Sequence, residues 1–164
     1  MAEKVDRRVR KTKAQLRAGL ARLMQKKSIK EITVKELVDE VDINRSTFYL
    51  HYSDIYQMLE SIENELMDEI DEVIEEHPLD LVKNGSSYPM IEHIFTILDN
   101  NKDICIALLG SNGDMGFVSR MEKMVADTVL RQLSGKFAAD NHDVEYVYAF
   151  CLNGCVGMIK AWLS

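Results

Sequence analysis

Apolar residues recur every three to four positions along most of this chain, a spacing that places them on one face of an α-helix. The chain nowhere alternates strictly between apolar and polar residues over a useful length, so the pattern predicts no β-strand. The first helix begins at Asp6 or at Thr12, which heads the capping-box spacing Thr12-x-x-Gln15. We predict an all-α fold with helices over residues 6 or 12 to 27, 34–41, 45–51, 53–77, 89–100, 102–109, 117–137 and 143–164.

A helix, a tight turn and a second short helix are predicted within residues 33–52. Thr33-x-x-Glu36 is typical of a capping box at the start of the first of these helices. Asp42 tolerates the left-handed backbone of a turn, and Asn44 can cap the helix that follows. This geometry lets the second helix enter the major groove of DNA, although any pair of short helices in a bundle shows the same spacing.

Charge divides the chain into two parts. The net charge of −7 conceals thirteen Lys and Arg against seven Asp and Glu in residues 1–52, which is +6, and seven against twenty in residues 53–164, which is −13. The first part would attract a polyanion and the second would repel it. We therefore divide the chain into a basic head over residues 1–52, which suits a nucleic acid, and an acidic helical body over residues 53–164, with two unrelated solvated surfaces as the alternative.

The inventory of reactive residues argues against an enzyme. The sequence has no Gly-rich phosphate loop and no metal-ligand spacing, and its four histidines have no evident nucleophile or carboxylate partner. Its three cysteines are odd in number and embedded in apolar sequence, which favours reduced core thiols over disulfides. We expect no cofactor and no metal. Without a long apolar run or a signal-like start, we expect a cytoplasmic, nucleoid-associated protein that does not enter a membrane.

The second helix of the helix-turn-helix presents an unusual outer face. Projection at 100° per residue puts Phe48 and Tyr52 on one side and Ser46, Tyr49 and Leu50 on the other. An ordinary exposed helix favours Glu and Lys, whereas residues 43–53 contain no acidic side chain before Asp54. Hydroxyl groups and a guanidinium on this face can bond base edges and phosphates.

These residues resemble a known signature. Ile32-Thr33-Val34 and the run Asn44-Arg45-Ser46-Thr47-Phe48-Tyr49-Leu50-His51-Tyr52 are similar to the tetracycline-repressor (TetR) family, and Phe-Tyr-x-His-aromatic is the most specific part. The resemblance is close over residues 8–65 and extends to the remainder as an all-helical body. It implies a DNA-binding domain over residues 1–52 and a helical domain for ligand sensing and dimerisation over residues 53–164. It also implies a homodimeric transcriptional repressor that binds a pseudo-palindromic operator in double-stranded DNA and is controlled by an effector.

The resemblance also implies roles for single residues. Thr33, Tyr49 and His51 would contact phosphates, and Arg45, Ser46 and Thr47 would lie nearest the bases, with Phe48 in the core. Thr33 and Asn44 can instead serve only as caps, and His51 can serve only to bond the next helix. The predicted DNA-binding set is Thr33, Asn44, Arg45, Ser46, Thr47, Tyr49, Leu50 and His51.

The last predicted helix is apolar nearly all round, so a single buried stripe does not account for it. One face would pack on the body, and the other would pack on a partner subunit, where Gly154 and Gly157 allow close approach. TetR proteins dimerise through their C-terminal helices, which agrees with this interpretation. The predicted dimer face comprises Cys151, Gly154, Cys155, Met158 and Trp162.

A pocket for a small hydrophobic effector is predicted between the body helices, with plain core packing as the alternative for each residue. A second hypothesis keeps the DNA-binding head and makes the body a docking surface for a protein partner, so that the chain acts as a co-regulator or an activator. The predicted pocket comprises Phe95, Leu98, Phe117, Met121, Met124, Tyr146 and Phe150.

Overall fold

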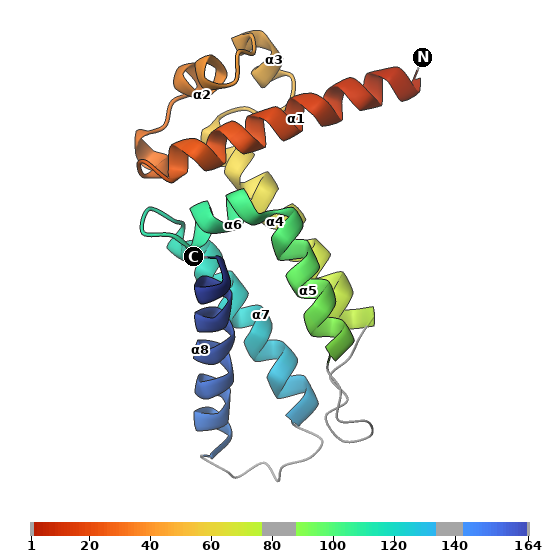
Figure 1. Ribbon diagram of the computed structural model, residues 1–164, viewed down its shortest axis with the longest axis vertical. Helices are drawn as coiled ribbons and strands as arrows, with labels where there is room; N and C mark the ends of the chain where they lie inside the picture. The colour runs from red at the N-terminus through yellow and green to blue at the C-terminus, as the bar shows by residue number, and fades with distance from the viewer. Residues whose placement is uncertain (1, 77–87, 134–142, 164) are drawn as a thin grey trace. The chain divides into compact units, whose positions relative to one another are not determined.

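The computed structural model describes residues 2–76, 88–133 and 143–163, and within these ranges every regular element is helical (Figure 1). The all-α prediction is therefore confirmed. No described helix is long and apolar enough to cross a membrane. The chain forms two compact units, of which unit 1 comprises residues 1–65 and 101–114 and unit 2 comprises residues 66–100 and 115–164.

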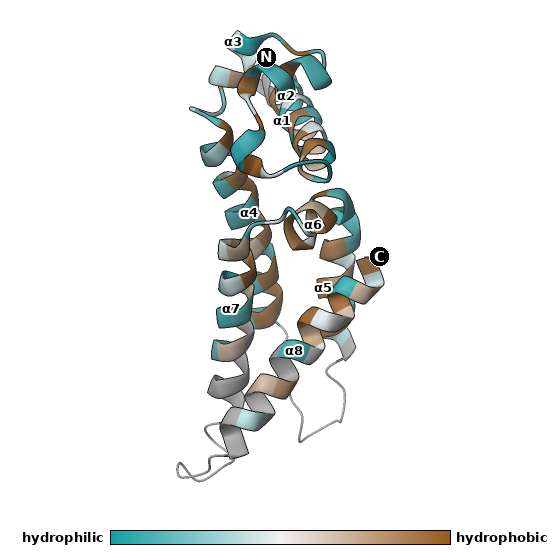
Figure 2. Ribbon diagram, turned by 90° about the vertical axis from the view of Figure 1, so that its left-hand side faces the viewer, coloured by the Kyte–Doolittle hydropathy of each residue, from teal (hydrophilic) through white to brown (hydrophobic). Residues whose placement is uncertain are grey.

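Unit 1 is built around its first helix. Helix α1 lies between the α2–α3 pair on one side and α6 on the other, as two perpendicular views show (Figures 1 and 2). Its elements are α1 (Ala2–Met24), a 3-10 helix (Ile29–Glu31), α2 (Val34–Glu40), α3 (Arg45–Tyr49), the first part of α4 (Ile55–Glu76) and α6 (Lys102–Leu109).

The core of unit 1 holds side chains from every one of these elements. Leu16 and Leu20 of α1, Leu37 of α2 and Phe48 of α3 are completely buried, and so is Leu108 of α6. Burying an aliphatic or aromatic side chain of this size stabilises the folded state by about 1.5–3 kcal/mol. Arg22 of α1 pairs with Glu40 of α2, and Lys27, which follows α1, pairs with Glu36 of α2. These side chains are partly or largely exposed, so solvent screens both pairs and they add little to stability.

The start of the chain differs from the prediction. Helix α1 begins at Ala2, so Thr12 is an interior helical residue and its predicted capping box is wrong. The helix ends at Met24, before the predicted end at residue 27. A capping box does occur at Ser28, which accepts a bond from Lys30 N and whose own N–H donates to Glu31 Oε2. The signal was present in the sequence, because Ser28-x-x-Glu31 has the capping-box spacing.

Unit 2 contains the second part of α4 together with three further helices. Helices α7 and α8 pack against each other, and Phe95 of α5 meets Trp162 of α8. The three helices are α5 (Tyr88–Asn100), α7 (Met115–Leu133) and α8 (Asp143–Leu163), close to the predicted ranges. The predicted division at residues 1–52 and 53–164 concerns function and stays a prediction. The compact unit 1 is larger than the first predicted part, because it also includes the start of α4 and all of α6.

Gly19 sets the distance between α1 and α2. A Cβ atom at this position would lie 2.3 Å from Val41 Cγ1 and 3.1 Å from Leu37 Cδ1. Val is stiff at χ1, so its methyl group cannot simply turn away. We therefore expect Gly19→Ala to lower the free energy of unfolding by about 1 kcal/mol, because overpacking outweighs the gain in helix propensity.

Urea denaturation measures this loss of stability. The double variant Gly19→Ala, Val41→Ala removes the clashing methyl groups, so its destabilisation should be smaller than the sum of the two single changes. Strict additivity would show that the two positions do not touch.

Candidate nucleic-acid interface

Local bonds form the helix-turn-helix as the sequence predicts. Thr33 caps α2, its hydroxyl accepting from Glu36 N at 3.2 Å. Asp42 adopts φ 52°, the left-handed conformation expected of it in the turn. Ile43 N then donates to Val38 O at 3.0 Å and closes the turn. The chain therefore reverses between α2 and α3 within very few residues.

Asn44 is the cap of α3. Its side-chain oxygen accepts from Ser46 N at 2.8 Å and from the Ser46 hydroxyl at 2.7 Å. These bonds satisfy one of the backbone donors that a helix start leaves without an intrahelical partner. Helix α3 is only five residues long, shorter than the predicted two turns, so its cap forms a large share of its local stabilisation.

Aromatic side chains anchor α3 to the unit. Phe48 is fully buried and meets Tyr49 edge-to-face at 5.4 Å and Tyr52 at 5.8 Å between ring centroids. Burial raises the pKa of Tyr52, the Glu65 carboxylate raises it further, and Arg17 partly offsets both. The Tyr52 phenol is thus neutral at physiological pH. Lys13 Nζ lies 5.7 Å from the centroid of this ring, so that cation also supports the anchor.

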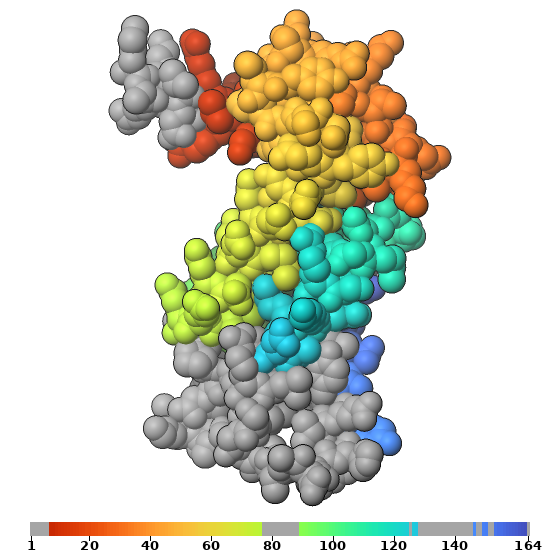
Figure 3. Space-filling model, turned by 180° about the vertical axis from the view of Figure 1, so that it is seen from behind, coloured from red at the N-terminus to blue at the C-terminus, as the bar shows by residue number. Residues whose placement is uncertain are grey.

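The opposite face of α3 is open to solvent. Arg45 and Ser46 are exposed, and Tyr49 and Leu50 have exposed fractions of 47% and 79%. The segment, orange to yellow in Figure 3, forms part of the surface seen in that view. Among the remaining predicted contacts, Thr33 and Asn44 are exposed, and Thr47 and His51 are half-buried. Six of the eight predicted residues are thus exposed, and the other two are half-buried.

Arg45 and Tyr49 form a pair that the sequence analysis missed. The Tyr49 hydroxyl accepts from Arg45 Nη2 at 3.0 Å and from Nε at 3.3 Å, and the guanidinium carbon lies 5.5 Å from the ring centroid. Two bonds and a cation–π contact restrict the long arginine side chain. The spacing of four residues on a helix was a usable signal for this contact.

The N-terminal half of α1 carries further positive charge. Arg7, Arg8, Arg10 and Lys11 are all exposed. Helix α1 begins at Ala2, so these cations lie beyond its first turn, where the helix macrodipole has little effect. Their exposed positive charge would attract an anionic partner.

The predicted pocket residues differ in exposure. Leu98 and Phe117 are core residues with almost no exposed surface, Met121 is buried, and Met124 is half-buried. Tyr146 and Phe150 are instead 73% and 80% exposed. Phe95 lines a groove on α5, where its aromatic neighbour is Trp162 of α8. That the seven residues share one pocket stays a prediction.

Helix α8 exposes an apolar face. Tyr146, Phe150, Met158 and Trp162 are exposed, and a Cβ atom added at Gly154 or Gly157 would meet nothing within 4 Å. Most of the described part of α8 is brown or white in Figure 2. Of the other two predicted dimer residues, Cys155 is half-buried, and the side chain of Cys151 lies outside the described residues.

The thiols and the acidic residues build no metal centre in the described part of the chain. Cys105 is buried, and neither it nor Cys155 forms a disulfide. No group of three or more His, Cys, Asp or Glu side chains gathers there in a way that could hold a metal ion.

Comparison with known proteins adds two findings. Residues 85–164 match the family model TetR_C_8, described as "Transcriptional regulator C-terminal region". The crystal structure of a TetR transcriptional regulator from Streptococcus agalactiae 2603V is similar over 99% of this chain and 88% of that chain, with a TM-score of 0.62 and 22% sequence identity. No curated protein matches the chain.

The two halves of the chain thus lead to the same family by different routes. The signature around α3 resembles TetR proteins over residues 8–65, and the family match covers residues 85–164. The solved structure shows that the fold is shared. Residues 85–164 thus match the C-terminal region of TetR transcriptional regulators, and the chain shares the fold of a TetR regulator.

Replacing Asn44 tests the cap of α3. Asn44→Ala removes both bonds from Ser46, so we expect the free energy of unfolding to fall by about 1 kcal/mol. Asn44→Asp keeps the acceptor oxygen and adds a charge that the helix N-terminus favours, so its stability should equal or exceed that of the wild type. Denaturant unfolding of the wild type, Asn44→Ala and Asn44→Asp measures these differences in stability. Equal losses in both variants would show that the cap is not what Asn44 contributes.

Proposed function

We propose that this protein binds a specific operator in double-stranded DNA as a homodimer, represses by occupying it, and is released by a small effector. The observation that carries the proposal is the outer face of α3. This face presents Arg45, Ser46, Tyr49 and Leu50 to solvent while Phe48 anchors the helix inside. A surface with these donors and no acidic side chain has the chemistry that base edges and phosphates require.

Each exposed group suits a particular part of the duplex. The Arg45 guanidinium can donate two parallel bonds to guanine O6 and N7, and Leu50 can meet a thymine methyl group. The Tyr49 hydroxyl accepts from Arg45 and keeps its own hydrogen for a phosphate oxygen. Thr33 at the start of α2 and the cations of α1 support further phosphate contacts.

Two copies are needed because α3 is short. A five-residue helix reaches few base pairs, and useful specificity requires two half-sites about one DNA turn, or a multiple of it, apart. The exposed side chains of Tyr146, Phe150 and Met158 on α8 support self-association in unit 2. A two-fold dimer would bind a pseudo-palindromic sequence.

Selection of bound sequences from a random DNA pool tests the function directly. We expect a two-fold symmetric consensus. On that consensus, Arg45→Ala should lose about 1–3 kcal/mol of binding free energy and relax the preference at one position of each half-site. Tyr49→Phe keeps the ring and removes the hydroxyl that holds Arg45, so it should lose about 1 kcal/mol.

Lys26→Ala is the matched control, because it removes one exposed positive charge from unit 1 outside the α3 face. Lys26→Ala should weaken binding to all DNA sequences slightly and to the same extent. Full retention of affinity and sequence preference in Arg45→Ala would remove the assignment of Arg45 as a base reader.

Bulk added to α8 tests the dimer face. Gly157→Leu meets open space within its own chain, so the fold should remain intact while close approach of a second copy is blocked. We expect the dimer dissociation constant to rise by about tenfold or more, equivalent to about 1.4 kcal/mol. Sedimentation measures it, with the exposed α4 change Glu60→Leu as the control. A dimer that Gly157→Leu leaves unchanged would move the interface away from this face.

A further inference from the structure

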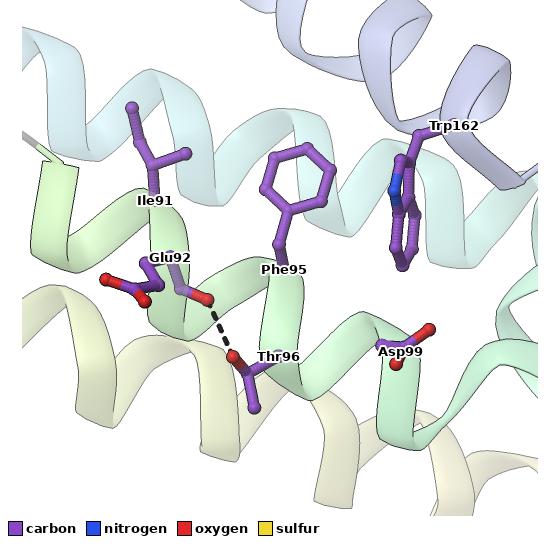
Figure 4. A pocket seen from close by; sticks show the side chains of 6 residues that line it. All are labelled: Ile91, Glu92, Phe95, Thr96, Asp99 and Trp162. Atoms are coloured by element: carbon purple, nitrogen blue, oxygen red, sulfur yellow. Dashed lines mark hydrogen bonds between the residues drawn. The ribbon is translucent and has the colours of Figure 1, made fainter.

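A groove in unit 2 has the chemistry of a ligand site. It has a volume of about 440 Å³ and lies between α5 and the end of α8 (Figure 4). This volume is in the range of small-molecule pockets. Five of the lining residues come from α5 and one from α8: Ile91, Glu92, Phe95, Thr96, Asp99 and Trp162.

The apolar wall of the groove is aromatic. Phe95 and Trp162 meet edge-to-face, with ring centroids 5.1 Å apart and planes at 86°. Trp162 keeps an exposed fraction of 39%, although aromatic rings of this size usually gain most by burial. The face of an aromatic ring carries partial negative charge, and indole attracts cations most strongly.

Two carboxylates complete the groove. Glu92 and Asp99 lie three and four residues from Phe95 on the same face of α5, so they flank the ring on either side along the helix. Both are exposed, and none of the lining residues is basic. The Thr96 hydroxyl donates to Glu92 O at 2.8 Å, so its hydrogen is already used within the helix (Figure 4). Every charged or π-rich group here favours a cation and disfavours an anion.

We propose that this groove binds an organic cation, an alkyl- or arylammonium compound whose charge lies between the carboxylates and the aromatic pair. The apolar substituents of such a ligand would cover Ile91, Phe95 and Trp162. That the cation acts as the effector rests on the function proposed above, whereas its binding to the groove does not.

Trp162 makes the test direct, because it is the single tryptophan of the chain. Its fluorescence reports on the groove without DNA or any added label. The probe is choline, and its control is 3,3-dimethylbutan-1-ol, which has the same shape without the charge. We expect choline to change the fluorescence saturably and the neutral alcohol to bind at least about tenfold more weakly, since the recognising groups are carboxylates and aromatic faces.

Paired variants separate local recognition from the general field of an acidic protein. The double change Glu92→Gln, Asp99→Asn should weaken choline binding by about five- to tenfold. The control Asp68→Asn, Glu75→Gln removes the same charge from exposed positions of α4 in the same unit and should leave binding nearly unchanged. Phe95→Leu keeps the groove apolar but removes the aromatic face, so it should weaken choline binding by about threefold.

Three results would overturn the proposal. One is an equal response to choline and to the neutral alcohol. Another is equal weakening by the groove variant and by the α4 control. The third is fluorescence that depends on protein concentration and ignores choline, which would identify a second copy of the chain as the occupant.

Operator binding with and without saturating choline then decides the regulatory role. Weaker operator binding supports an effector. If choline saturates the fluorescence change and operator binding stays the same, the effector role is overturned. The groove as a cation site and the recognition of DNA are then both unaffected. Failure of the chain to select any DNA sequence would instead count against the proposed function alone.

Discussion

The burial of Phe48 is the interaction on which the exposed face of α3 depends. Its ring is completely enclosed and meets Tyr49 and Tyr52, so α3 can rotate very little about its own axis. A helix of five residues has almost no intrinsic stability, because too few backbone bonds offset the cost of starting it. Packing of one aromatic side chain and the cap at Asn44 therefore do what helix propensity cannot, and they direct Arg45, Tyr49 and Leu50 outward.

The pairing of Arg45 with Tyr49 gives this face a second property. An arginine that must be ordered on binding loses side-chain entropy, whereas one already held by a phenol oxygen and a ring loses less. In the function proposed above, Arg45 would read bases and the Tyr49 hydroxyl would contact a phosphate. The bond between them would then couple affinity to sequence preference through a single side chain.

Most of the helical framework could be predicted because its signals are local. Six of the helices begin and end within a few residues of the predicted ranges, and the roles of Thr33, Asp42 and Asn44 follow from short side chains that bond or permit the adjacent backbone. The start of α1 was wrong because Thr12 has the capping-box spacing in the middle of a longer helix. A cap motif is ambiguous wherever both flanking segments favour a helix, and only the observed helix resolves it.

The periodicity, the charge division and the run from Asn44 to Tyr52 were enough by themselves to determine an all-helical chain with a short exposed helix at α3. They could not determine which distant helices share a core. Helix α6 joins unit 1, and Trp162 of α8 meets Phe95 of α5, because these contacts depend on chain direction over many residues and not on neighbours in sequence. Periodicity says that a helix has an apolar face; only the tertiary packing decides what that face meets.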